Sequence, residues 1–190
     1  DNKPFRTRDG GVYKLNLLFE DVKSKLTKYN SDDNVLNSLT NTVLTYSDLL
    51  PNRNQNYIFD VDKFTDINGK TGIYIQYAQV RAKKLLENSD IAGSFDNNLE
   101  MSDEERNLLF QITMFDNFFD LSLSNMEPHH LAEYLYSLSQ SFNSFYSNIK
   151  IFKDDLSLDI QKNRIKMVEE FYNTVKIVFE CLGIRPVDSM

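Results

Sequence analysis

Cysteine is almost absent from this 190-residue sequence, which contains a single one, Cys181. One cysteine can form neither a disulfide nor a Cys-based metal cluster within a chain. This usage is typical of a reducing, cytoplasmic setting. Cys181 falls on the apolar side of the last helical pattern, so we expect it to be a small core residue.

Long apolar runs are lacking too. None approaches the roughly 18 residues needed to span a bilayer, and no signal peptide opens the sequence, so we expect no membrane partner. The chain starts Asp1-Asn2-Lys3 without Met, and we interpret it as a fragment, with removal of a tag as the alternative. Six glycines and four prolines are few for a turn-rich β-sandwich, whereas 14 Phe and 10 Tyr can fill a real core.

The charge balance limits the choice of partner. A formal net charge of −7 argues against a protein that coats nucleic acid indiscriminately, and we expect no DNA partner. Local RNA recognition remains open, because a selective RNA reader can work by stacking and hydrogen bonds with few phosphate contacts.

Helical periodicity runs through most of the sequence. A first helix is expected to end near Lys28, a second to follow a cap at Asp32 or Asp33, and a third to run from Thr71 to 88. A fourth should start at the capping box Ser102-Asp103-Glu104-Glu105 and reach Phe119. A fifth should begin at Pro128, and a sixth should span 158–182 before Gly183. A short extended segment is expected at Tyr57-Ile58-Phe59. The sequence therefore predicts an all-α fold, with a helical bundle over 71–190 and a helix-and-loop segment over 1–70.

Familiar catalytic patterns are missing. The sequence shows no Ser/His/Asp arrangement, no phosphate-cradling GxGxxG and no P-loop. His129 and His130 are neighbours on a helix, so we expect their rings to diverge, and no carboxylate stands at a convincing metal spacing. No metal site is predicted.

Several stretches, in order, resemble the arginyl-tRNA synthetase family. Lys3-Pro4-Phe5-Arg6-Thr7-Arg8-Asp9-Gly10 resembles the loop with its degenerate KMSKS signature, and Tyr46-Ser47-Asp48-Leu49, Asn52-Arg53 and Tyr57-Ile58-Phe59-Asp60 resemble the end of its catalytic region. Gly72-Ile73-Tyr74-Ile75-Gln76-Tyr77-Ala78-Gln79-Val80-Arg81 resembles the entry helix of its DALR anticodon-binding domain. Tyr134-Leu135, Phe142-Asn143-Ser144-Phe145-Tyr146 and Leu182-Gly183-Ile184 with Met190 extend the match.

The resemblance implies a parent enzyme that joins arginine to tRNA-Arg, with ATP and Mg²⁺. It places 1–70 at the end of the catalytic domain and 71–190 in the anticodon-binding bundle. The family's HIGH motif and arginine pocket have no counterpart in the 190 residues. We therefore expect this polypeptide alone to be inactive as a ligase and to hold no cofactor.

Two groups of candidate site residues follow. Arg6, Thr7 and Arg8 are candidates for contact with ATP, because cations on a closing loop can stabilise a departing pyrophosphate. From the residues alone, a solvated basic loop is the alternative. Which of the three side chains touches phosphate stays open.

The second group lies on one side of a helix, where Tyr74, Tyr77 and Arg81 are spaced by three and four residues. Tyrosine can stack on an unpaired base, and arginine can stack or grip phosphate. From the residues alone, tyrosines packed in the core are the stronger reading. The resemblance implies instead that these positions face the anticodon loop, together with Tyr146 and Met190.

The alternative function is a non-catalytic helical module that docks a protein. Such a module should expose a contiguous apolar patch. The tRNA hypothesis predicts accessible tyrosines beside Arg81.

Overall fold

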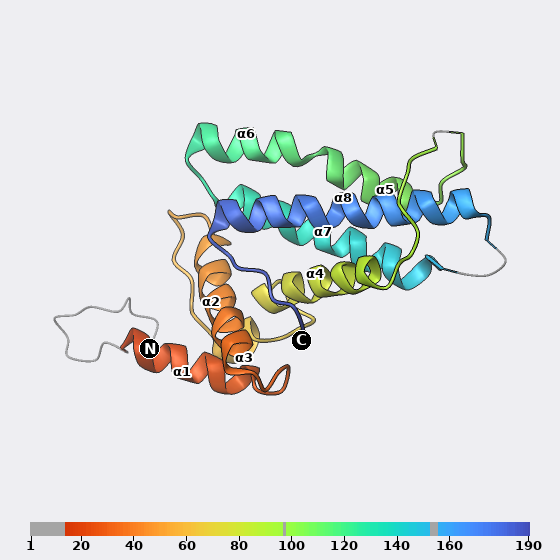
Figure 1. Cartoon of the computed structure of the whole chain (residues 1–190). Coiled ribbons are helices and arrows are strands. Elements are labelled where there is room, and N and C mark those ends of the chain that lie inside the picture. The colour runs from red at the N-terminus through yellow and green to blue at the C-terminus, as the bar shows by residue number, and fades with distance from the viewer. Residues whose placement is uncertain (1–13, 97, 153–155) are drawn as a thin grey trace.

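The computed structural model describes residues 14–96, 98–152 and 156–190, and this part of the chain folds into helices (Figure 1). Eight helices form in it: α1 (Leu15–Leu26), α2 (Asp33–Leu49), α3 (Val61–Phe64), α4 (Gly72–Glu87), α5 (Asp103–Thr113), α6 (Phe115–Asn125), α7 (His129–Asn148) and α8 (Leu158–Leu182). No strand occurs among these described residues, including at Tyr57-Ile58-Phe59. The predicted all-α fold is confirmed.

Local chemistry sets several helix ends as predicted. The Asp32 side chain accepts hydrogen bonds from the backbone N–H groups of the first turn of α2. Ser102 and Glu105 form a complete capping box at the start of α5. At the end of α8, Gly183 adopts φ 69°, a left-handed conformation that glycine reaches without strain.

The helix expected to run from Ser102 to Phe119 is in fact two helices. The helix is interrupted at Met114, which lies between the end of α5 and the start of α6. The Tyr134 hydroxyl, from α7, donates to the Gln111 carbonyl at 3.0 Å, and the Phe118 ring stacks on the Tyr134 ring. These contacts satisfy a carbonyl near the break and hold the first turns of α6 against α7.

The main core lies between α4, α5, α7 and α8, which pack side by side in Figure 1 with α6 along one outer edge. Phe142 of α7 and Phe171 of α8 are fully buried there, with ring centroids 4.0 Å apart and ring planes within 7° of parallel. Tyr46 of α2 reaches into this core and donates its hydroxyl to the Ala132 carbonyl at 2.9 Å. The N-terminal helices are thereby fastened to the bundle.

A second core lies where α1, α2 and α3 meet α4. It contains Val22 and Leu26 of α1 together with Ile73 and Val80 of α4, and also Val187 near the end of the chain. The segments on either side of residue 70 therefore share buried contacts. Their division into two domains stays a prediction.

The C-terminal segment runs back across α4 (Figure 1) and is held by one buried side chain. The Gln76 amide nitrogen donates to Thr42 Oγ1 at 2.9 Å and to the Arg185 carbonyl at 2.7 Å. Its oxygen accepts from the Val187 N–H at 3.2 Å. One amide thus joins α2, α4 and the C-terminal segment.

The close approach of α4 to α2 generates the first prediction, for Gly72→Ala. An added Cβ would lie 2.8 Å from the Thr42 carbonyl oxygen, so one helix must shift. Overpacking costs about 1–3 kcal/mol, and better helix propensity offsets up to about 1 kcal/mol. We expect a net loss of about 1–2 kcal/mol in a urea unfolding curve. In the control Gly69→Ala, the added Cβ meets the Thr71 methyl at 3.0 Å but no backbone atom nearer than 3.6 Å. Equal losses in both variants would contradict the argument.

The second prediction concerns Glu105, whose carboxylate is almost buried. Burial alone would raise its pKa, but Arg164 Nε at 2.7 Å and the Ser102 N–H at 2.8 Å donate to it and lower the pKa below its usual value of 4.5. Stability from this carboxylate is therefore full above pH 4.5 and lost as the pH falls through the lowered pKa.

Accordingly, Glu105→Gln should lower the free energy of unfolding by about 1.5–3 kcal/mol at pH 7, the usual value of a charged hydrogen bond. The deficit should shrink below about pH 4. Denaturation curves of both proteins between pH 3 and 7 measure it. A deficit that stays constant over this range would show that the charge of Glu105 plays no part.

Candidate functional site

The candidate site is a row of polar and aromatic side chains along the adjoining sides of α4 and α7, which we call the α4–α7 rim. It consists of Tyr74, Tyr77 and Arg81 of α4 and Tyr136, Asn143 and Tyr146 of α7. All six are accessible to some degree, and Tyr146 is 38% exposed. Their spacing puts them on the sides of the two helices that border solvent.

Burial along α4 explains this placement. Ile75, Ala78 and Ala82 are fully buried in the main core, and Ile73 is fully buried in the second. The helix is thus buried on most of its circumference, and Tyr74, Tyr77 and Arg81 lie on the accessible side. These three residues share one helix side, as the spacing predicts.

The Arg81 guanidinium is the centre of the rim. It lies over the Tyr77 ring, 4.0 Å from its centroid, and over the Tyr146 ring, 4.8 Å from its centroid. Arg81 Nη2 donates to the Tyr77 hydroxyl at 2.8 Å, and Nη1 donates to Asn143 Oδ1 at 3.0 Å. No ion pair joins Arg81 to a carboxylate of the described residues. Its positive charge is oriented but not neutralised.

A second aromatic pair continues the rim toward the start of α4. The rings of Tyr74 and Tyr136 are 5.4 Å apart at their centroids. Lys70 lies over the Tyr136 ring at 5.3 Å and is also paired with Glu133. The rim therefore alternates tyrosine rings with cationic groups over its length.

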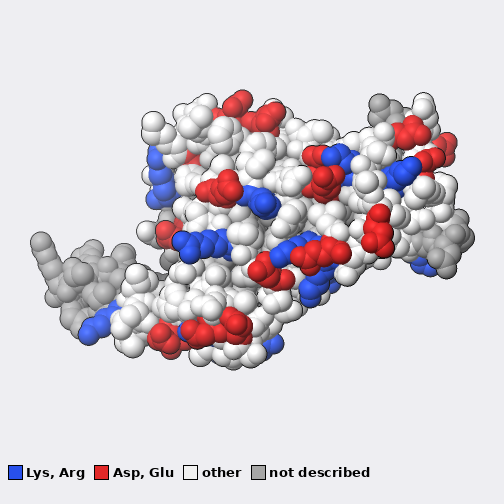
Figure 2. All heavy atoms as spheres, viewed as in Figure 1, with Lys and Arg blue, Asp and Glu red and all other residues white. Residues whose placement is uncertain are grey.

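Arg81, Lys83 and Lys84 form a cationic cluster in the sequence of α4, and the structure separates its members. Lys83 is paired with Asp188 and Glu87. Lys84 is exposed, has no ion pair to a described carboxylate, and follows Arg81 on the same side of the helix. On the face of the molecule in Figure 2, acidic and basic side chains are interspersed, so that face carries no large patch of one sign. Positive charge at the rim is local.

The remaining predicted residues lie elsewhere. Met190 is half-buried and packs against the second core, with no described contact to Tyr77 or Arg81. Its part in closing the site stays a prediction. Arg6, Thr7 and Arg8 lie outside the described residues.

Sequence reasoning missed two members of the rim. Tyr136 and Asn143 are seven residues apart and share one side of α7. Their spacing of two helical turns was the available signal.

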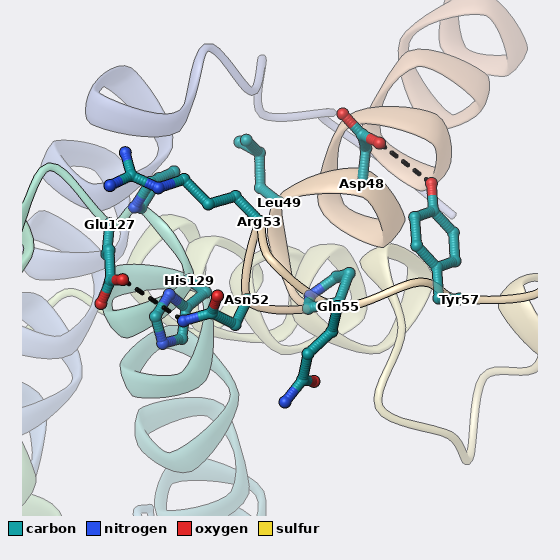
Figure 3. Close-up of a pocket in the computed structure, with 10 residues that line it drawn as sticks. Asp48, Leu49, Asn52, Arg53, Gln55, Tyr57, Glu127 and His129 are labelled. Carbon is teal, nitrogen blue, oxygen red and sulfur yellow. Dashed lines mark hydrogen bonds between the residues drawn. The ribbon is translucent and has the colours of Figure 1, made fainter.

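A separate pocket of about 300 Å³ lies at the turn between α6 and α7 (Figure 3). It is lined by the end of α2 and the segment that follows it, and by the turn before α7 with the first residue of that helix: Asp48, Leu49, Pro51, Asn52, Arg53, Gln55, Tyr57, Glu127, Pro128 and His129. The Tyr57 hydroxyl donates to Asp48 Oδ1 at 3.0 Å, and burial together with this bond raises the pKa of Tyr57 to about 12.

The expectation that the rings of His129 and His130 diverge is wrong, because the two rings lie against each other. The centroids of His129 and His130 are 4.0 Å apart, and His130 Nε2 lies 3.2 Å from Glu127 Oε2. Both residues belong to the first turn of α7, where no preceding turn restricts their rotamers. The rings can therefore turn toward each other.

The expectation that Cys181 is a core residue is also wrong, because its side chain is exposed. It lines an apolar hollow of about 460 Å³ at the end of α6, beside Leu123, Met126 and Leu131. No described helix is both long and apolar enough to cross a membrane.

Residues 75–190 match the family model of the DALR anticodon binding domain. The arginine–tRNA ligase of Francisella tularensis subsp. tularensis strain SCHU S4 is 35% identical over the whole of this chain and 34% of its own length. That of Alkaliphilus oremlandii is 31% identical, again over 34% of its length. The chain thus spans about a third of these curated relatives.

Solved structures agree. The arginyl-tRNA synthetase of Plasmodium falciparum superposes with a TM-score of 0.78 at 29% identity, over 94% of this chain and 34% of that one. The Thermus thermophilus arginyl-tRNA synthetase gives 0.85 at 20% identity over 95% and 33%, which is a likeness of fold. The resemblance to the arginyl-tRNA synthetase family is confirmed, and the family match over 75–190 shows that the chain belongs to the DALR anticodon-binding domain family.

Proposed function

We propose that this chain is the tRNA-binding C-terminal part of an arginine–tRNA ligase and that its α4–α7 rim binds the anticodon loop of tRNA-Arg. One observation supports this most: the Arg81 guanidinium is held between Tyr77 and Tyr146 and has no described carboxylate partner. A half-exposed cation that lies between two rings and has no carboxylate partner is better suited to binding RNA than to stabilising the packing of the helices.

The chemistry of the rim fits an unstacked loop. A base can stack on an exposed tyrosine ring, and the guanidinium offers further N–H donors to phosphate. Asn143 adds an amide that can read the edge of a base, since its oxygen already serves Arg81 and its NH₂ group has donors to offer. Lys84, one turn further along, is placed to meet the next phosphate.

In the proposed parent enzyme, arginine is activated with ATP and Mg²⁺ and then transferred to the 3′ end of tRNA-Arg in the cytoplasm. Arg6, Thr7 and Arg8 remain the proposed ATP-loop residues, and Tyr74, Tyr146 and Met190 complete the proposed tRNA contacts. Binding at the anticodon, far from the reacting groups, would be used to favour the correct tRNA. The 190-residue polypeptide by itself is expected not to form arginyl-adenylate.

The protein-docking alternative predicts an apolar patch. Leu121, Leu123 and Met126 are exposed at α6, which lies along the outer edge of the bundle, away from α4 in Figure 1. The rim itself is polar and aromatic. The tRNA proposal is the one that the family match and the rim support together.

The third prediction separates stacking from packing at Tyr77. Tyr77→Ala should weaken binding of tRNA-Arg tenfold to a hundredfold, because a stacked base contributes about 1–3 kcal/mol. Binding of a mismatched tRNA should change little. Filter binding and the melting temperature should be measured on the same samples.

A matched control exists on α8, where Tyr172 carries Lys176 over its ring at 5.6 Å. Tyr172→Ala removes the same kind of tyrosine–cation pair away from the rim and should leave tRNA affinity unchanged. If Tyr77→Ala melts early while the folded fraction binds tRNA normally, Tyr77 is a packing residue and the rim assignment fails.

The fourth prediction concerns salt. Few cations are free at the rim, so the slope of log affinity against log salt should be shallow, with a magnitude of roughly two to four. Arg81→Ala should weaken the binding of both tRNA-Arg and the mismatched tRNA. It should also reduce the magnitude of the slope by about one, if one phosphate contact is lost. Lys176→Ala removes one charge elsewhere and should leave the slope as it is. A steep slope that neither variant changes would indicate general polycation binding.

A further inference from the structure

We propose that Glu127, His129 and His130, at the turn between α6 and α7, form a binding site for a divalent transition-metal ion of the Zn²⁺ type. Each of the three residues offers one ligand atom, and all three atoms lie within 4.8 Å of one another. The site is separate from the α4–α7 rim and does not depend on the tRNA proposal.

The distances are close to those that an ion requires. A tetrahedral Zn²⁺ with bonds of about 2.0–2.1 Å holds its ligand atoms about 3.3 Å apart. His130 Nε2 and Glu127 Oε2 are already 3.2 Å apart. The His129 ring stands against the His130 ring, and its ligand atom needs to approach by about 1.5 Å at most to match that spacing. All three side chains are partly exposed, so small rotations suffice.

The ligand types favour one class of ion. Imidazole nitrogen suits Zn²⁺, Cu²⁺ and Ni²⁺, whereas Mg²⁺ and Ca²⁺ prefer oxygen ligands. Two imidazoles and one carboxylate leave a fourth position open on a tetrahedral ion. His129 and Glu127 both line the pocket of about 300 Å³ in Figure 3, so that position has room for a water molecule or a small ligand.

Neighbouring residues hold the carboxylate in place. Asn52 Nδ2 donates to Glu127 Oε1 at 3.4 Å, which leaves Oε2 for an ion. The Glu127 N–H donates to the Ser122 carbonyl, and the Ser122 hydroxyl donates to the Glu127 carbonyl, both at 2.9 Å. Oriented carboxylates of this kind are what metal sites use.

The charged residues around the site have opposite effects on the binding of a cation. Arg53 lines the pocket, and its Nη1 donates to the Met126 carbonyl at 2.9 Å, so its charge disfavours a nearby cation. Asp48 lines the same pocket and favours one. We therefore expect moderate affinity, set mainly by the three ligands.

A hydrogen bond between Glu127 and His130 would explain two of the three residues without a metal. It does not explain His129, whose ring lies against His130 and beside the pocket. The chain has only two histidines in 190 residues, and both are in this cluster with the carboxylate. Binding measured through histidine therefore reports on this place alone.

The test uses the whole chain, with Zn²⁺ in isothermal titration calorimetry and Co²⁺ in proton NMR of the imidazole rings. We expect one Zn²⁺ per chain, and Co²⁺ should shift the ring signals of both histidines. Because the native chain supplies the NMR result, it does not depend on whether any variant folds. Unshifted ring signals, or no saturable Zn²⁺ uptake, would overturn the proposal.

Variants then assign the ligands. His129→Ala, His130→Ala and Glu127→Gln should each weaken Zn²⁺ binding at least tenfold. Glu133→Gln, a partly exposed carboxylate on the same helix, and Cys181→Ser, which lines the adjacent hollow, should bind Zn²⁺ like the native chain. Loss of binding in Cys181→Ser would show a thiol site instead, and retention in all three ligand variants would equally refute the assignment.

Discussion

The fold depends on the surroundings of Gln76, a polar side chain that is completely buried. Its amide completes hydrogen bonds to Thr42, to the Arg185 carbonyl and to the Val187 N–H. Loss of this side chain would leave buried partners unsatisfied, at a cost of about 1–3 kcal/mol for each group. The amide therefore specifies how α2, α4 and the C-terminal segment fit together, beyond what apolar packing alone can specify.

This constraint acts on the rim because α4 carries half of it. Because α4 packs against α2 on one side and against α7 and α8 on the others, Tyr77 and Arg81 are held beside Tyr146. Rings and guanidinium that are ordered before RNA arrives lose less conformational entropy on binding. Asn143 contributes to this order by holding one side of the guanidinium.

Helix ends and the faces of helices were predictable from the sequence because they follow from nearby residues. Ser102 with Glu105 and Gly183 with the end of α8 are such cases. The contact between Arg81 and Tyr146 was not predictable from spacing, since it joins residues of two different helices. The family resemblance implied only that both residues face the anticodon loop. The exposure of Cys181 was not predictable from spacing either, since it depends on how α6 and α8 end beside each other.

The histidine pair shows a different limit. Helical geometry predicts that neighbouring side chains diverge, which is correct within a helix but not in a first turn that is free of steric neighbours. Glu127 joins the pair because α6 ends in a left-handed residue, Met126 with φ 54°, which turns the chain before Pro128. A positive φ at methionine has no clear sequence signal, because glycine is the usual residue there.

The second core has a consequence for the order in which the chain folds. Val22 and Leu26, in the first helix, share that core with Val187, near the opposite end of the sequence. A chain made from its N-terminus can form α1 early, but the surroundings of these side chains are complete only after Val187 has been synthesised as well. Contacts so distant in sequence slow the search for the native state. The second core should therefore complete its packing after the bundle has formed.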